Sequence, residues 1–207
     1  MNIRKKAKKP VAYAFIDSQN LNLGTQRMGW KLDWRKFRQY LADKHGVTHA
    51  YMFIGYMAEN EALYEYMYEL GFLIVLKPTV DVTHSHDGAE TGPKTDAEKA
   101  AAKLKRAEDK AKPAAEKEHE KPTIKGNVDA ELVLYAMKEL PNYQQAIIVS
   151  GDGDFFSLAE YLQEQGKLAH ILTPNWQYSS LLKVFEPKII RLDQMRRQLA
   201  YHDRKKK

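Results

Sequence analysis

The chain has 207 residues, a net charge of +6 at pH 7 and a pI near 9.2, and it contains no cysteine. Its length and its 43% hydrophobic content suit one domain with a full core. Without cysteine, disulfides and thiolate metal ligands are excluded, so a metal would need oxygen or imidazole ligands. No apolar run is long enough for a transmembrane helix or a secretory signal. We therefore expect a cytoplasmic protein that does not contact membranes.

Basic residues are concentrated in the segments 1–10 and 193–207, which we interpret as tails on either side of a domain at 11–192. Such tails usually serve solubility. A basic protein nevertheless attracts polyanions, and the phosphates of a nucleic acid are the polyanions that such a charge favours.

Apolar runs of strand length alternate with helical patterns along the chain. The predicted strands lie at 11–16, 49–56, 72–77, 145–150, 167–172 and 188–192, and the predicted helices at 32–44, 59–70, 129–140, 155–165 and 179–184. Residues 21–31 are interpreted as a loop or a short helix. Repeated βα units favour parallel strands with right-handed crossovers. The sequence thus predicts an α/β fold, a Rossmann-like three-layer sandwich with a mostly parallel central sheet.

One segment interrupts this alternation. Between residues 79 and 123 the hydrophobic content falls to alanines and little else, and charges of both signs are mixed. A segment of this composition cannot bury enough apolar surface to order itself, so we interpret 79–123 as a charged insertion in the domain.

Two predicted strands end in acidic residues. Asp17 follows the first strand, and Ser150-Gly151-Asp152-Gly153-Asp154 follows the fourth. In a doubly wound sheet these strands are neighbours at the switch point where ligands bind, so Asp17 and Asp152 should face each other. Close carboxylates repel unless a cation or a proton lies between them. The pattern predicts an all-oxygen site for Mg²⁺ or Mn²⁺, which suits phosphodiester hydrolysis. The alternative is a strand-to-helix turn in which Asp154 caps the next helix.

Further polar residues lie near these acids in the sequence. Asn20 would supply a neutral ligand oxygen or orient a phosphate or a water, although an Asn at this position also caps turns. Asp129 lies in the first turn of a helix, where the helix dipole alone already favours an acid. Lys125, followed by a glycine, would meet a phosphate, and Ser150 is a second candidate for substrate binding.

Three stretches together resemble the signature motifs of the NYN domain, LabA-like branch, in the PIN-like nuclease group. They are FIDSQN at 15–20, KGNVD at 125–129 and VSGDGDF at 149–155. The resemblance implies a metal-dependent ribonuclease, with RNA a more suitable partner than DNA. It implies that the metal-binding, catalytic acids are Asp17, Asp129, Asp152 and Asp154, that Asn20 is a site residue and that Lys125 lies by the substrate phosphate.

The chain departs from the family pattern at Tyr135, where many relatives carry a further acid six residues after the position of Asp129. A second metal would be held poorly there. Two hypotheses follow: a ribonuclease that uses Mg²⁺ or Mn²⁺, and a non-catalytic RNA-binding or regulatory NYN domain. A phosphatase with an aspartyl nucleophile is disfavoured, because it needs an acid two residues after Asp17, where Gln19 stands. Endonuclease or exonuclease action and the oligomeric state, a homodimer included, stay open.

Overall fold

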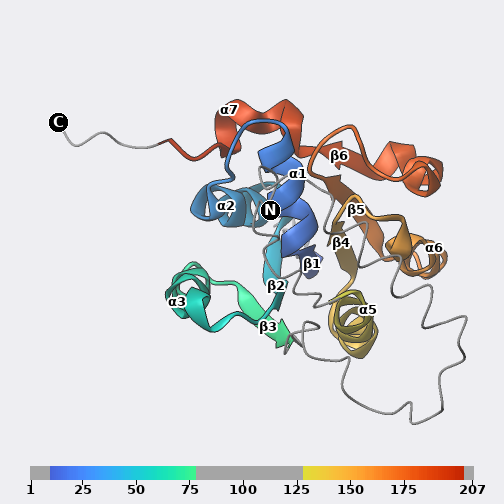
Figure 1. Cartoon of the computed structure of the whole chain (residues 1–207). Coiled ribbons are helices and arrows are strands. Elements are labelled where there is room, and N and C mark those ends of the chain that lie inside the picture. Colours follow the sequence, from blue (N-terminus) through green and yellow to red (C-terminus); the bar gives the residue numbers. More distant parts are fainter. Residues whose placement is uncertain (1–9, 78–127, 203–207) are drawn as a thin grey trace, which may run out of the picture. The chain divides into compact units, whose positions relative to one another are not determined.

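A computed structural model describes residues 10–77 and 128–202. Six strands form one sheet in the order β3-β2-β1-β4-β5-β6, and every neighbouring pair is parallel (Figure 1). The predicted strands are confirmed, and the sheet is parallel throughout. The strands are β1 (Ala12–Asp17), β2 (Val47–Gly55), β3 (Leu73–Lys77), β4 (Gln145–Val149), β5 (Leu168–Thr173) and β6 (Ile189–Arg191).

Helices cover both faces of the sheet, which makes the predicted three layers. The first face carries α1 (Ser18–Arg27), α2 (Trp34–His45), α3 (Glu61–Glu69) and α7 (Arg196–Leu199). The second face carries α5 (Asp129–Lys138), α6 (Phe156–Glu164) and the 3-10 helix η5 (Ser180–Lys188). Shorter 3-10 turns are η1 (Ala58–Asn60), η3 (Leu140–Asn142), η4 (Gly153–Phe155) and η6 (Leu192–Met195). This division is what right-handed crossovers on either side of β1 produce.

The segment expected to be a loop or a short helix is the helix α1, which begins earlier than predicted. Asp17 is the last residue of β1 and also the N-cap of α1, because its Oδ1 accepts a hydrogen bond of 3.0 Å from the Asn20 backbone N–H. Asp33 caps α2 in the same way, through the Lys36 N–H at 3.1 Å. Strand and helix therefore join at Asp17 with no loop between them.

The folded domain continues past residue 192, where the sequence places a basic tail. Leu199 and Ala200 are buried, and Ala200 forms an antiparallel bridge with Leu32. The Tyr201 N–H donates to the Lys31 carbonyl at 2.8 Å. These contacts fasten the described part of the C-terminal segment beside α2. Residues 1–9, 203–207 and the predicted insertion at 79–123 lie outside the described residues. No helix in the described part of the chain is both long and apolar enough to cross a membrane.

Candidate active site

The edge of the sheet at the carboxyl ends of β1 and β4, where this topology places a crevice, gathers most of the polar residues singled out in the sequence. β1 pairs with β2 on one side and β4 on the other, and the helices that follow β1 and β4 cover opposite faces. Loops that leave in opposite directions open a crevice at this point of a parallel sheet. The register pairs Ile16 with Val149, so the next residues, Asp17 and Ser150, are side by side.

Hydrogen bonds tie the two turns together. The Ser150 hydroxyl donates to Asp17 Oδ2 at 3.1 Å and accepts from the Asp152 N–H at 3.1 Å. Asn20 Oδ1 accepts from the Gly151 N–H at 2.9 Å. Asn20 and Ser150 therefore act first as braces that hold the two acidic turns in register.

Asp17 is a buried carboxylate, with 5% of its surface exposed. Burial raises its pKa above the ordinary value, and the nearby Asp152 carboxylate acts in the same direction. Hydrogen bonds from the Asn20 N–H and the Ser150 hydroxyl oppose this effect without cancelling it. A carboxylate in this setting favours a bound proton or a bound cation.

The two acids after β4 differ in their surroundings. Asp152 is half-buried, and its Oδ1 accepts the Asp154 N–H at 3.1 Å, so that Asp152 caps the turn η4. Asp154 lies inside that turn and is exposed. The alternative in which Asp154 caps the following helix is therefore wrong, because Phe155 precedes α6 as its N-cap.

Asp129 is the first residue of α5 and is half-buried, and α5 packs against β1 and η4. Within residues 10–77 and 128–202, no three Asp, Glu or His side chains are grouped closely enough to hold a metal ion. The set of four acids predicted from the sequence thus stays a prediction, and Lys125 lies outside the described residues.

The donors at this edge of the sheet are nevertheless of the kind that a divalent cation prefers. Mg²⁺ is commonly held by one or two carboxylates, with waters and substrate oxygens completing its shell. Asp17 and Asp152 supply two carboxylates, and the Asp17 oxygens accept hydrogen bonds from the Asn20 N–H and the Ser150 hydroxyl, with a further backbone contribution from Gln19. All donors at this point are oxygens, which suits Mg²⁺ or Mn²⁺.

Tyr135 belongs to an aromatic cluster that includes Phe53, the residue paired with Asp17 in the register of β1 and β2. Its ring centroid lies 5.7 Å from those of Tyr51 and Phe53 on β2, and the Lys138 ammonium lies 5.2 Å from it. The position at which the family resemblance leads us to expect a further acid here helps to pack α5 on the sheet.

Sequence reasoning missed a loop that borders the crevice, residues 174–179. The Ser179 N–H donates to the Gly151 carbonyl at 2.9 Å. A Cβ on Gly153 would lie 2.4 Å from Ser179 Oγ, so this turn needs glycine for close approach. The partners are far apart in the sequence, and no local pattern announces the contact.

A three-layer domain with this strand order and with acids at the switch point defines a Rossmann-like α/β protein of the PIN-like kind. The NYN domain family profile matches residues 12–192, and the chain belongs to that family, whose domains are PIN-like nuclease domains. Its place in the LabA-like branch remains an expectation from the sequence motifs.

Among solved structures, the chain is similar to a protein of unknown function from Vibrio parahaemolyticus, known from a crystal structure. The two are 18% identical, the alignment covers 95% of this chain and 99% of that chain, and the TM-score is 0.63. At this identity the likeness shows the fold alone. No curated protein matches the chain.

Proposed function

We propose that the protein is a metal-dependent ribonuclease that hydrolyses RNA phosphodiester bonds in the crevice between β1 and β4. Membership of the NYN family supports the reaction class. The observation that carries the proposal is Asp17, a buried carboxylate braced on both oxygens and placed near a second carboxylate, Asp152. Asp17 also caps α1, and within residues 10–77 and 128–202 no ion pair with a basic side chain compensates its charge.

The burial and hydrogen bonds of each residue suggest a different role for it in this reaction. Asp17 offers a fixed, desolvated oxygen and Asp152 a more accessible one, and a bound Mg²⁺ or Mn²⁺ supplies an activated water and charge neutralisation at the phosphate. Asn20 and Ser150 hold these two acids in place. Asp129 and Asp154 are proposed as further ligands, and Lys125 and Ser150 as substrate contacts. The net charge of +6 would attract the RNA. We include a cytoplasmic location in the proposal, which the cysteine-free composition supports.

The decisive measurement is cleavage of labelled RNA in Mn²⁺ by the wild type and by Asp152→Asn. This substitution keeps the shape of the side chain and removes its charge, so we expect a loss on the order of 100-fold or more. The control is Asp43→Asn, which changes an exposed acid on α2 that bonds only to Gln39 among the described contacts. Equal cleavage by wild type and Asp152→Asn would assign the activity to a contaminant.

A second candidate function is an RNA-binding or regulatory domain without turnover. Two observations favour it: the described residues hold no group of three metal-binding side chains, and Tyr135 packs as an aromatic residue where many relatives carry an acid. The same experiment separates the two candidates. RNA binding by the wild type with no cleavage in either Mg²⁺ or Mn²⁺ would favour this second function over the first.

A further inference from the structure

The loop at residues 174–179, here called the Trp176 loop, presents an exposed tryptophan beside the candidate active site. Trp176 is 59% exposed, whereas its neighbour Asn175 is only 4% exposed. An indole left in solvent beside the buried residues Pro174 and Asn175 lacks a packing role that would account for it.

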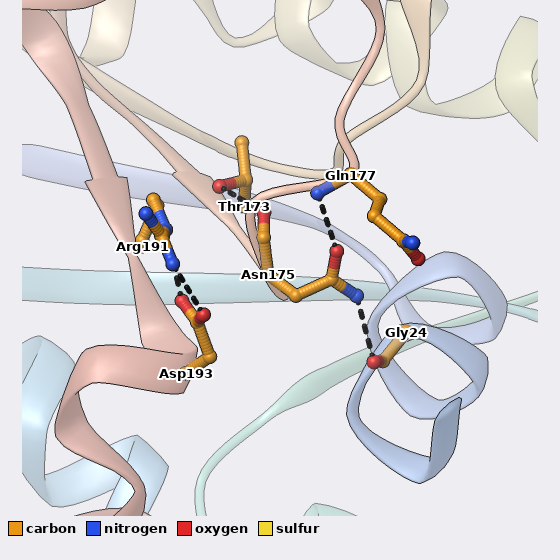
Figure 2. A network of polar contacts seen from close by, with 6 residues as sticks. All are labelled: Gly24, Thr173, Asn175, Gln177, Arg191 and Asp193. Atoms are coloured by element: carbon orange, nitrogen blue, oxygen red, sulfur yellow. Dashed lines mark hydrogen bonds and ion pairs between the residues drawn. The ribbon is translucent and has the colours of Figure 1, made fainter. Parts of the chain in front are cut away.

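The first half of the Trp176 loop is rigidly fastened, as Figure 2 shows. Asn175 Nδ2 donates to the Gly24 carbonyl of α1 at 2.8 Å, and Asn175 Oδ1 accepts from the Gln177 N–H at 2.7 Å. The Thr173 hydroxyl donates to the Asn175 carbonyl at 3.2 Å. Residues on both sides of Trp176 are thus held, so its backbone is already ordered and binding through the indole would cost little backbone entropy.

The second half of the loop lies against the turn that carries Asp152. The Ser179 N–H bonds to the Gly151 carbonyl at 2.9 Å, and a Cβ on Gly151 would lie 3.2 Å from Tyr178 Cβ. The end of the loop therefore contacts the acidic turn, and a strand of RNA with a phosphate at Asp152 would have its neighbouring nucleotides in reach of this loop.

Trp176 and Tyr178 line a cavity of about 450 Å³ together with residues of η5, β6 and η6, namely Glu186, Ile189, Ile190, Arg191 and Gln194. The Arg191 guanidinium is held by the Asp193 carboxylate through hydrogen bonds of 3.1 and 2.6 Å (Figure 2). A guanidinium held flat in this way offers a planar face for stacking.

The charges of this cavity argue against a phosphate as its occupant. The positive charge of Arg191 is already compensated by Asp193, and Glu186 on the rim adds a negative charge. A neutral, flat, partly polar group suits such a cavity better, and its aromatic walls offer π faces to it.

We propose that the Trp176 cavity binds one unpaired nucleobase of the RNA, next to the phosphate that is cleaved, by stacking on Trp176. This inference rests on the proposed function and extends it, because it makes single-stranded RNA the preferred substrate at this position. Stacking tolerates all four bases, so the cavity would select for an unpaired strand rather than for a sequence.

The test is binding of a fluorescent single-stranded oligouridine, followed by anisotropy in EDTA so that no turnover occurs. Trp176→Ala should weaken binding about 5- to 150-fold, and Trp176→Phe, which keeps an aromatic face, should restore most of it. The matched control is Tyr68→Ala, which removes another exposed aromatic residue, 70% exposed on α3. An abasic oligomer of equal length should bind the wild type and Trp176→Ala equally.

The outcomes distinguish this inference from the function on which it rests. Equal oligouridine binding by wild type and Trp176→Ala would overturn the nucleobase site and leave the nuclease proposal standing. Tighter binding of the abasic oligomer by the wild type than by Trp176→Ala would mean that the loop contacts the backbone, which also overturns the site. No binding by the wild type in EDTA would overturn the nucleobase site, whereas the nuclease proposal is tested separately by cleavage in Mn²⁺. Equal melting temperatures of the variants would confirm that the fold is intact.

Discussion

Among the described residues, the Asp17 carboxylate and a pair of half-buried histidines are two ionisable sites against the sheet that are built differently. Asp17 lies at the carboxyl edge, whereas His45 and His170 lie beside α2 and β5 with ring centroids 5.0 Å apart. Burial raises the pKa of Asp17 and lowers the pKa of both histidines, so each group is discouraged from carrying charge.

The difference lies in the polar surroundings. Both oxygens of Asp17 accept hydrogen bonds, and a second carboxylate lies near. Among the described residues, His170 Nδ1 is buried and has no hydrogen-bond partner. The hydrogen bonds at the edge of the sheet therefore stabilise a negative charge that a cation can balance, whereas the surroundings of the histidine pair favour the neutral imidazoles. Only the first arrangement has the character of a ligand site.

The largest expected effect concerns the metal. The free energy of unfolding of the wild type should rise by about 2.7 kcal/mol when free Mn²⁺ is 100 times its Kd, and Asp17→Asn should lose most of this gain. Urea unfolding with and without Mn²⁺ measures the difference, and calorimetric titration gives the Kd. His170→Phe is the control and should keep the full gain. Equal gains in wild type and Asp17→Asn would contradict a metal site at this edge.

The next effect is the opposite change in stability: without a metal, Asp17→Asn should stabilise the protein. Because burial raises the pKa of Asp17 above its ordinary value of 3.8, the folded protein holds a proton there more tightly than the unfolded chain. The contribution of Asp17 to stability is therefore lost as the pH rises through the folded pKa. In EDTA at pH 7, Asp17→Asn should be more stable than the wild type, and the difference should shrink as the pH falls toward 4.

Urea unfolding at several pH values tests this expectation. Asp152→Asn keeps the buried Asp17 carboxylate and should keep most of the pH dependence of the wild type. An Asp17→Asn protein that is less stable than the wild type at pH 7 would contradict this expectation, because it would show that the ionised carboxylate stabilises the fold even without a bound metal.

The smallest effect should appear at the histidine pair. The lowered pKa of His170 means that the unfolded chain takes up its proton first, so stability is lost as the pH falls below the ordinary value of 6.5. His170→Phe should lose less stability between pH 7 and 5 than the wild type in the same unfolding measurement. His49→Asn, which changes an exposed histidine on β2, is the control for the removal of a histidine. Parallel curves for wild type and His170→Phe would refute a role of this residue in acid sensitivity.

The fold was accessible from the sequence because its signals are local. Each of the six strands is a short apolar run, and alternation with helices dictates parallel pairing. The segment after residue 192 was harder to predict, since Leu199 lies among basic residues and its burial depends on contacts with the chain near Asp33.

The candidate site was accessible only in outline. A rule of topology places Asp17 beside the turn at 150–154, but it does not predict which side chains form hydrogen bonds with which partners. Asn20 reaches Gly151 across 131 positions of sequence, and Asn175 reaches Gly24 across 151. Contacts of this range leave no periodic signal, and for that reason the Trp176 loop was not anticipated.

The pairing of β1 with β4 has a consequence for the making of the protein. Asp17 and Ser150, which meet in the finished crevice, are 133 positions apart, and the first is synthesised long before the second. Until β4 has left the ribosome, a growing chain carries one acid of the crevice without its counterpart. Under the proposed function, a nascent chain would therefore be harmless to the messenger from which it is being translated.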